Sequence, residues 1–263
     1  MTASALLEAE DLVVTRGGAP ILRGVSVTLR AGEAVALVGP NAAGKSTLVR
    51  TFAGLLPVTS GIVRLEGKPL AEWGRSALAR AVALVTPEEG APVLLSVQER
   101  VALGRYPHRG PFRPLTPADR DAVSVALHRT GIAHLAHRPL STLSSGERQL
   151  AALARSLAQQ PRVLLLDEPA AHLDIGHQLQ LFRILDEIRG GGGVAVLAVV
   201  HDLQRAAAWA ERMLLLDGGR LAASGAPAAV LGSKECARAF HVEIRGHAAA
   251  GLSHSVYSFE EIL

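Results

Sequence analysis

The stretch from Gly39 to Thr47 constrains the fold of this chain more than any other part of the sequence. It reads Gly-Pro-Asn-Ala-Ala-Gly-Lys-Ser-Thr and fits the pattern G-x-x-x-x-G-K-[ST]. The apolar residues Ala34–Val38 before it predict a strand, and Ser46–Ala53 after it predict a helix. A strand, a glycine-rich loop and a helix in this order are what a phosphate-binding loop requires. A plain glycine-rich turn is the alternative, and the complete pattern disfavours it.

Each part of this loop has a chemical role if a nucleotide binds there. Backbone N–H groups and the positive end of the helix dipole would face the phosphates. Lys45 would neutralise charge on the β- and γ-phosphates, and Ser46 would offer its hydroxyl to Mg²⁺. The predicted nucleotide-binding residues are Gly39, Pro40, Asn41, Ala42, Ala43, Gly44, Lys45, Ser46 and Thr47.

Two further apolar strands end on polar residues that could act on the same phosphates. Asp167 and Glu168 follow the apolar run Val163–Leu166, and His201 follows Val194–Val200. Ligands bind at the carboxyl ends of strands in open α/β sheets. Asp167 is therefore a predicted Mg²⁺ ligand, Glu168 the predicted group that orients or deprotonates the attacking water, and His201 a donor to the γ-phosphate. The alternatives are two acidic residues that open a turn at Pro169 and a structural histidine.

The segment Leu143–Gln149 supports two interpretations. Ser144 and Glu147 have the spacing of a capping box at the start of an amphipathic helix. Gly146 lowers helix propensity in that first turn but permits close approach of a phosphate. A capped, dipolar helix start is also an anion site, so Ser144, Ser145, Gly146 and Glu147 could contact a phosphate. One chain cannot usually bring two such sites to one γ-phosphate, whereas two chains facing head-to-tail can.

The remaining pattern predicts a parallel α/β core with additions. Short strands are expected over Leu6–Leu29, with turns at Gly17–Gly18 and at Gly24, and Met213–Leu216 is the last predicted strand. Strand and helix patterns alternate from Val163 onward, which favours a parallel sheet. Prolines and glycines interleaved with helical patterns predict an inserted helical subdomain over about 87–158. The residues after Leu231 give no readable pattern.

Composition excludes some classes of protein. Aromatic residues make up 3% of the chain, and 27 basic residues stand against 24 acidic ones, so no nucleic-acid partner is expected. The single cysteine, Cys236, fits a reducing compartment. The local basic cluster of Arg105, His108, Arg109 and Arg113 contains prolines and predicts a solvated loop, with a partner-contact surface as the alternative. No apolar run approaches the ~20 residues that cross a bilayer, so any membrane role would come through a partner.

Taken in order, these motifs resemble those of the ATP-binding subunits of ABC transporters, over nearly the whole chain. Gly39–Thr47 is similar to the Walker A motif, Leu143–Gln149 to the signature motif and Leu164–Glu168 to Walker B. Residues 171–174, which include Asp174, resemble the D-loop, and His201 resembles the switch histidine. Val101–His108 resembles a segment of importers of iron-siderophores, haem and cobalamin.

The resemblance implies a P-loop NTPase (RecA-like) α/β core with an N-terminal antiparallel β subdomain and the helical insertion. Residues 5–240 would form this ATP-binding domain and residues 241–263 a C-terminal tail. Two copies would hold two ATP molecules, with Mg²⁺, between the Lys45 loop of one and Ser144–Gly146 of the other. The homodimer would drive an integral-membrane permease from the cytoplasmic face of the inner membrane. A substrate-binding protein would deliver the transported molecule, which the sequence does not identify.

Three departures from the family pattern bear on the site. The aromatic ring that usually stacks on adenine is replaced by Arg16, whose guanidinium can also stack. Ala42 and Ser145 replace usual glycines, and both are small. Pro87 occupies the place of a glutamine that usually touches magnesium and the permease contact loop, so Glu88 or a water would substitute, or coupling would differ.

Two other functions remain open from the sequence. The first is a non-transport ATPase of the same family, acting in iron–sulfur assembly or on nucleic acid. The second is a nucleotide-sensing regulatory subunit without turnover, which Pro87 makes plausible. An importer ATPase for an iron chelate, haem or cobalamin is the leading hypothesis.

Overall fold

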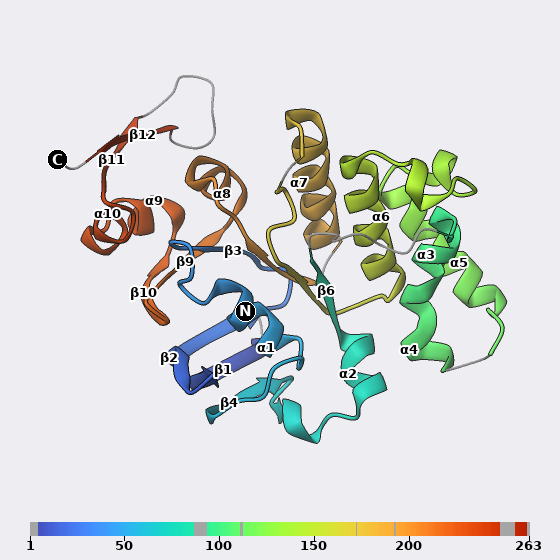
Figure 1. Ribbon diagram of the computed structural model, residues 1–263, viewed down its shortest axis with the longest axis horizontal. Coiled ribbons are helices and arrows are strands. Elements are labelled where there is room, and N and C mark those ends of the chain that lie inside the picture. Colours follow the sequence, from blue (N-terminus) through green and yellow to red (C-terminus); the bar gives the residue numbers. More distant parts are fainter. Residues whose placement is uncertain are drawn as a thin grey trace.

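A six-stranded sheet forms the centre of the computed structural model of this protein (Figure 1). Its strand order is β10-β9-β3-β8-β7-β6, and the strands from β9 through to β6 pair in parallel. The structure describes residues 5–86, 94–110, 113–171, 173–191, 193–247 and 256–261. Pro87 and Glu88, for which a departure from the family pattern was predicted, lie outside these described residues.

The strands are β1 (Ala5–Arg16), β2 (Ala19–Arg30), β3 (Ala34–Val38), β4 (Ser60–Leu65), β5 (Lys68–Pro69), β6 (Val82–Val85), β7 (Val163–Leu166), β8 (Ala195–Val199), β9 (Arg212–Asp217), β10 (Arg220–Gly225), β11 (Val242–His247) and β12 (Val256–Glu261). The α-helices are α1 (Lys45–Phe52), α2 (Arg75–Ala81), α3 (Val97–Ala102), α4 (Tyr106–Arg109), α5 (Pro117–Arg129), α6 (Ser145–Ala158), α7 (Ile175–Gly190), α8 (Leu203–Trp209), α9 (Pro227–Leu231) and α10 (Lys234–Phe240). Short 3-10 helices are η1 (Leu70–Glu72), η2 (Leu103–Arg105), η3 (Ala133–Leu135) and η4 (Leu140–Thr142).

The chain begins with an antiparallel sheet in the order β2-β1-β4-β5. Its first two strands are 12 residues each, so the prediction of short strands was wrong. The predicted turn at Gly17–Gly18 is confirmed, since it joins β1 to β2. Gly24 makes no turn. It lies inside β2 with φ 77°, at a register shift where Leu12 pairs with Val25 and Val13 with Arg23, so it forms a bulge.

The two faces of the central sheet belong to two separate hydrophobic clusters. In β3, Val35 and Leu37 pack with the N-terminal sheet and α1, whereas Ala36 and Val38 pack with α6, α7 and α8. Every residue of β3 is buried, as expected of a strand covered on both faces. The clusters therefore hold the carboxyl ends of the central strands in fixed relative positions.

Helices α3 to α6 form a group on one side of the molecule, away from the N-terminal sheet (Figure 1). Capping boxes start α3 at Ser96 and α5 at Thr116. Within this group Arg105 is only 6% exposed, so the prediction of a solvated loop is wrong for this residue. Its guanidinium donates to the carboxylate of Asp119 at 2.8 Å and to the carbonyl of Ala158 at 2.8 Å. The charge is buried because an internal carboxylate compensates it.

The chain continues beyond Met213–Leu216, which was predicted to be the last strand. β10 follows it on the edge of the central sheet, and β11 and β12 form a separate two-stranded sheet after α10. The backbone N–H of Tyr257 in β12 donates to Oε1 of Gln204 in α8 at 2.7 Å, which docks this hairpin on the core. Among the described residues, no helix has both the length and the apolar character needed to cross a bilayer.

Candidate functional site

The carboxyl ends of three neighbouring strands bring the predicted chemical groups together. β3 leads into the Gly39–Thr47 loop, β8 leads to His201, and β7 leads to Asp167 and Glu168. These strands are adjacent in the order β3-β8-β7. Residues more than 120 positions apart thus meet at one edge of the sheet, as Ser46 and Asp167 do.

The phosphate loop is held by close backbone contacts with two other segments. A Cβ at Gly39 would lie within 3.0 Å of the carbonyl oxygen of Leu216, and Gly39 has φ 151°. A Cβ at Gly44, where φ is 103°, would lie 2.9 Å from Leu22. Gly219, in the turn after β9, donates its N–H to the carbonyl of Ala43 at 3.1 Å. Both motif glycines are therefore required by the packing of this loop as well as by its conformation.

Lys45 lies buried inside the loop rather than in solvent. It is 5% exposed, and its ammonium donates to the carbonyl oxygens of Gly39 at 2.7 Å and Pro40 at 2.8 Å. Burial lowers the pKa of Lys45, while the carboxylates of Glu168 and Asp167 act in the opposite direction. An ammonium has three donors, so one remains for a phosphate oxygen.

Ser46 and Asp167 form an oxygen-rich pair that suits magnesium. The Ser46 hydroxyl donates to Oδ1 of Asp167 at 2.8 Å, and the Asp167 residue is 3% exposed. Mg²⁺ prefers oxygen ligands and is usually held by one or two carboxylates together with substrate phosphates. These two residues fit that donor set. No cluster of three or more His, Cys, Asp or Glu suited to a metal occurs in the part of the chain that the structure describes.

Arg50 also contacts Asp167, which the sequence did not indicate. Its guanidinium lies 3.6 Å from Oδ2 of Asp167, one turn of α1 beyond Ser46. The two oxygens of this buried carboxylate are thus occupied by different neighbours, which fixes its orientation. The sequence gives no signal for such a contact, because most arginines on amphipathic helices face solvent.

Glu168 and His201 face each other across the carboxyl ends of β7 and β8. Nε2 of His201 lies 2.8 Å from Oε1 of Glu168, and both side chains remain partly exposed. The Glu168 backbone has φ 53°, a left-handed conformation that non-glycine residues adopt at a cost. This conformation turns the chain immediately after Asp167. The two acidic neighbours therefore face different partners, Ser46 and His201.

The loop after Glu168 is braced by Gln178, a second residue that the sequence did not single out. Its side-chain amide donates to the carbonyls of Ala170 at 3.3 Å and Leu173 at 3.0 Å. A small cavity of about 130 Å³ lies beside this brace, with Glu168 and His201 in its lining. Gln178 lies on α7. From the sequence alone it cannot be distinguished from a residue of that helix that faces solvent.

Arg16 lies at the end of β1 with an exposed side chain. Val14, two residues earlier, pairs with Leu22, the residue that packs against Gly44 in the phosphate loop. Two residues of a strand span about 7 Å. Arg16 is thus near the loop, and its stacking on adenine stays a prediction.

The segment Ser144–Glu147 begins α6, and its capping interpretation is confirmed. The Ser144 hydroxyl accepts from the Glu147 N–H at 3.2 Å, and the Ser144 N–H donates to the Glu147 carboxylate at 2.7 Å. This second bond is the main reason that the pKa of Glu147 is lowered. Within the described residues, no hydrogen bond or ion pair links this segment to Lys45, Ser46 or Glu168. The structure thus brings together Lys45, Ser46, Asp167, Glu168 and His201, and it leaves this segment apart from them.

Asp174, in the predicted D-loop, lies beside the Ser144–Glu147 segment. It caps α7 by accepting from the N–H of His177 at 2.9 Å, and its second oxygen lies 2.8 Å from Nδ1 of the same residue. These bonds lower the pKa of Asp174. The ring of His177 packs against Gly146. His177 is the third residue of this region that sequence reasoning missed.

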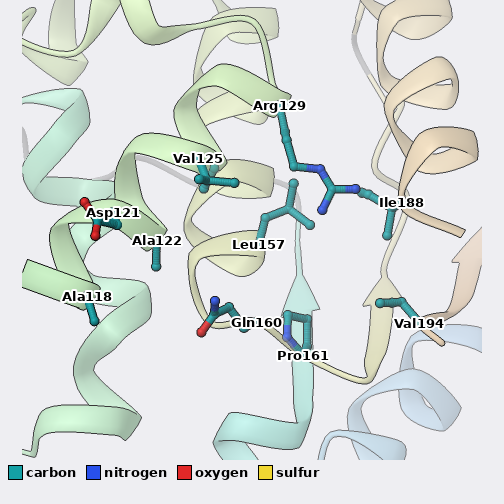
Figure 2. Close-up of a pocket in the computed structure, with 11 residues that line it drawn as sticks. Ala118, Asp121, Ala122, Val125, Arg129, Leu157, Gln160, Pro161, Ile188 and Val194 are labelled. Carbon is teal, nitrogen blue, oxygen red and sulfur yellow. The ribbon is translucent and has the colours of Figure 1, made fainter. Parts of the chain in front are cut away.

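A larger cavity of about 450 Å³ lies away from these groups, between α5, α6 and α7. Figure 2 shows the guanidinium of Arg129 near Leu157 and Ile188 at this cavity. None of the predicted phosphate-binding or acidic site residues lines it. The chemistry at the sheet edge therefore does not involve this cavity.

Comparison with known proteins agrees with the geometry. The family model described as ABC transporter matches residues 22–171. The hemin import ATP-binding protein HmuV of Streptomyces coelicolor is 46% identical over 225 residues, which cover 86% of this chain and 79% of that protein. The ferric enterobactin transport ATP-binding protein FepC of Escherichia coli is 39% identical over 223 residues, which cover 85% of this chain and 82% of that protein.

Solved structures show the same fold. The cbiO1 protein of Clostridium perfringens, part of the ABC transporter complex cbiONQ, is 30% identical with a TM-score of 0.77, covering 89% of this chain and 93% of its own. The ADP conformation of MJ1267, an ATP-binding cassette of an ABC transporter, has a TM-score of 0.82 at 22% identity and covers 90% of this chain and 99% of its own. From its sequence, its fold and its sheet-edge geometry, this chain belongs to the ABC transporter family, as one of the subunits that bind and hydrolyse ATP.

Proposed function

We propose that this chain energises an importer of haem or of another iron chelate. The main support for a role in import is the 46% identity to a hemin import ATP-binding protein over 86% of this chain. The 39% identity to a ferric enterobactin transport protein supports the same class with a different iron compound. Cobalamin is a third candidate cargo, from the resemblance of Val101–His108.

The ATP site is proposed to work through the groups at the sheet edge. Lys45, with one donor left beyond its bonds to Gly39 and Pro40, would bind the β- and γ-phosphates. Ser46 and Asp167 would hold Mg²⁺, which supplies neutralisation of phosphate charge when bound. Glu168 would orient and deprotonate the attacking water, and His201, at 2.8 Å, would hold that carboxylate and donate to the γ-phosphate.

The complete site is proposed to need a second copy of the chain. Ser144–Glu147 forms a capped helix start, which favours an anion, yet it makes no described bond to the Lys45 loop of its own chain. A head-to-tail homodimer would place it on the partner's γ-phosphate. Closure and opening of this dimer would drive the membrane permease at the cytoplasmic face of the inner membrane, with a substrate-binding protein delivering the cargo.

An uptake experiment tests this function. Cells that lack this gene are supplied with iron only as haem, or only as a ferric siderophore, and are complemented with the wild-type chain or with Glu168→Gln. We expect growth on at least one iron source with the wild type and none with Glu168→Gln, because the variant lacks the water-activating carboxylate. Affinity purification from solubilised membranes should recover an integral-membrane permease.

Soluble assembly factors or nucleic acid in that purification, with unchanged growth on every iron source, would instead support a non-transport ATPase. Growth that requires the chain but is equally restored by Glu168→Gln would support a regulatory subunit without turnover. An uptake defect limited to cobalamin would keep the importer and change its cargo.

A further inference from the structure

Gly146 is packed against the side chain of a residue 31 positions further along. A Cβ at Gly146 would lie within 3.0 Å of Cδ2, Cγ and Nδ1 of the His177 imidazole. Real Cβ atoms do not approach other atoms so closely, so one of the two groups would have to move. The ring thus occupies the space that any other residue at position 146 would need.

The imidazole cannot leave this place without cost, because Asp174 holds it. Nδ1 of His177 lies 2.8 Å from Oδ2 of Asp174, while Oδ1 accepts the backbone N–H of the same histidine at 2.9 Å. The side chain of His177 is largely buried, with 29% of it exposed. Two bonds from one carboxylate therefore fix both the start of α7 and the ring that it presents to α6.

The contact joins two segments, of which the first is proposed to reach the partner subunit's nucleotide. One is the first turn of α6, with Ser144 and Gly146, and the other is the loop that carries Asp174. The Glu147 carboxylate lies near the same ring, because a Coulombic contribution from His177 is the last of the causes that lower the pKa of Glu147. A helix start and a loop that share one imidazole must shift together.

We propose that His177 is a positioning residue that sets the first turn of α6 against Asp174, and that position 146 is glycine chiefly to accept this ring. The proposal deepens the function proposed above and rests on it. It assigns the glycine requirement to a contact within one subunit. The competing explanation is that a glycine is needed so that the phosphate of the partner's ATP can approach the α6 backbone.

A double-mutant cycle separates the two explanations. Rates of ATP hydrolysis are measured for the wild type, Gly146→Ala, His177→Ala and the double variant. Because misplacing a binding group by about 1 Å can cost roughly 100-fold, we expect kcat to fall by about 10- to 100-fold in Gly146→Ala. In the His177→Ala background the same substitution should change kcat by no more than about twofold, since the clash is gone.

Further measurements distinguish positioning from a general structural effect. His177→Ala alone should lower kcat with little change in KM, because the Lys45 loop is untouched. His177→Gln should restore most of kcat, since its amide can still donate to Asp174. The affinity of the monomer for ATP should match the wild type in Gly146→Ala and in His177→Ala, while ATP-driven dimerisation in a Glu168→Gln background weakens.

Two results would overturn the proposal. One is an equal loss from Gly146→Ala with and without His177, which would assign the glycine to the partner's phosphate. The other is a wild-type kcat in His177→Ala. Failure of the proposed function is distinguishable: without an ATPase site the wild-type chain would hydrolyse no ATP at all, and a wrong import assignment would appear in the uptake experiment while leaving these hydrolysis rates unchanged.

Discussion

Ala42 is a residue whose backbone conformation conflicts with its side chain. It lies exposed in the phosphate loop with φ 62°, in the left-handed region where a Cβ is crowded by the neighbouring carbonyl. The family pattern usually has a glycine at this place. Ala43, the next residue, is buried and has no positive φ, so the two adjacent alanines are in opposite situations.

Replacing Ala42 with glycine should therefore stabilise the protein. Relief of left-handed strain is worth about 1–2 kcal/mol, and the extra entropy of glycine in the unfolded chain removes about 0.4–1 kcal/mol of that gain. We expect a slightly higher midpoint of thermal unfolding for Ala42→Gly, measured without nucleotide. Ala43→Gly is the matched control and should lower the midpoint, because it adds the entropy cost and removes a buried methyl group. A fall in both variants would contradict the strain argument.

At the scale of elements, the ion pair between Arg105 and Asp119 joins η2, α5 and the end of α6. The guanidinium donates to the Asp119 carboxylate, the Ala158 carbonyl and Oε1 of Gln160. Arg105 first, and then Thr116, lower the pKa of Asp119 from 3.8 to about 2. Stability from this carboxylate is thus present above about pH 4 and is lost as the pH falls from about 4 towards 2.

The free energy of unfolding should therefore decrease across this acidic range, and less steeply in Asp119→Asn than in the wild type. The measurement is urea unfolding at a series of pH values from 5 to 2. One titrating proton contributes at most about 1.4 kcal/mol per pH unit. Asp121→Asn is the control. It removes an exposed carboxylate from the same helix and leaves the buried ion pair of Arg105 and Asp119 intact. Equal slopes for the wild type and Asp119→Asn would refute this assignment.

Elements were predictable from sequence where one local signal determined them. The helix predicted over Ser46–Ala53 is confirmed as α1 (Lys45–Phe52), which begins directly after the glycine-rich loop. The apolar runs before Gly39, Asp167 and His201 likewise gave the strands and thereby the sheet edge. The Arg105 segment was misjudged because a basic cluster near prolines looks solvated, and only the fold supplies Asp119 as its partner.

Contacts across the site were less predictable. Arg50, His177 and Gln178 lie on helix faces whose direction depends on how α1 and α7 pack. Their targets are a carboxylate, a glycine and two carbonyl oxygens, 5 to 117 positions away in sequence. No local sequence pattern predicts such pairs. A sequence motif therefore identifies the reacting groups but not the residues that position them.

At the scale of the whole molecule, water activation and dimer closure should be separable. Glu168→Gln removes the carboxylate but keeps Lys45, Ser46 and Asp167, so ATP should still bind. We expect the variant to accumulate as a dimer with ATP and Mg²⁺, measured by analytical ultracentrifugation, because hydrolysis no longer reopens it. Adding Lys45→Ala is the control and should return the protein to monomer. A Glu168→Gln variant that stays monomeric would contradict either the role of Glu168 or the two-copy site.

The contact of Gly39 with the Leu216 carbonyl has a consequence for how the chain can vary. The phosphate loop packs against the hairpin at Asp217–Gly219, which lies far along the sequence. The backbone N–H of Gly219 donates to the carbonyl of Ala43. Lengthening or reshaping that surface hairpin would displace the phosphate loop. It would therefore weaken nucleotide binding before it lowered the stability of the protein. A hairpin that resembles a permissive site for peptide tags or fluorescent inserts is thus expected to tolerate such insertions poorly.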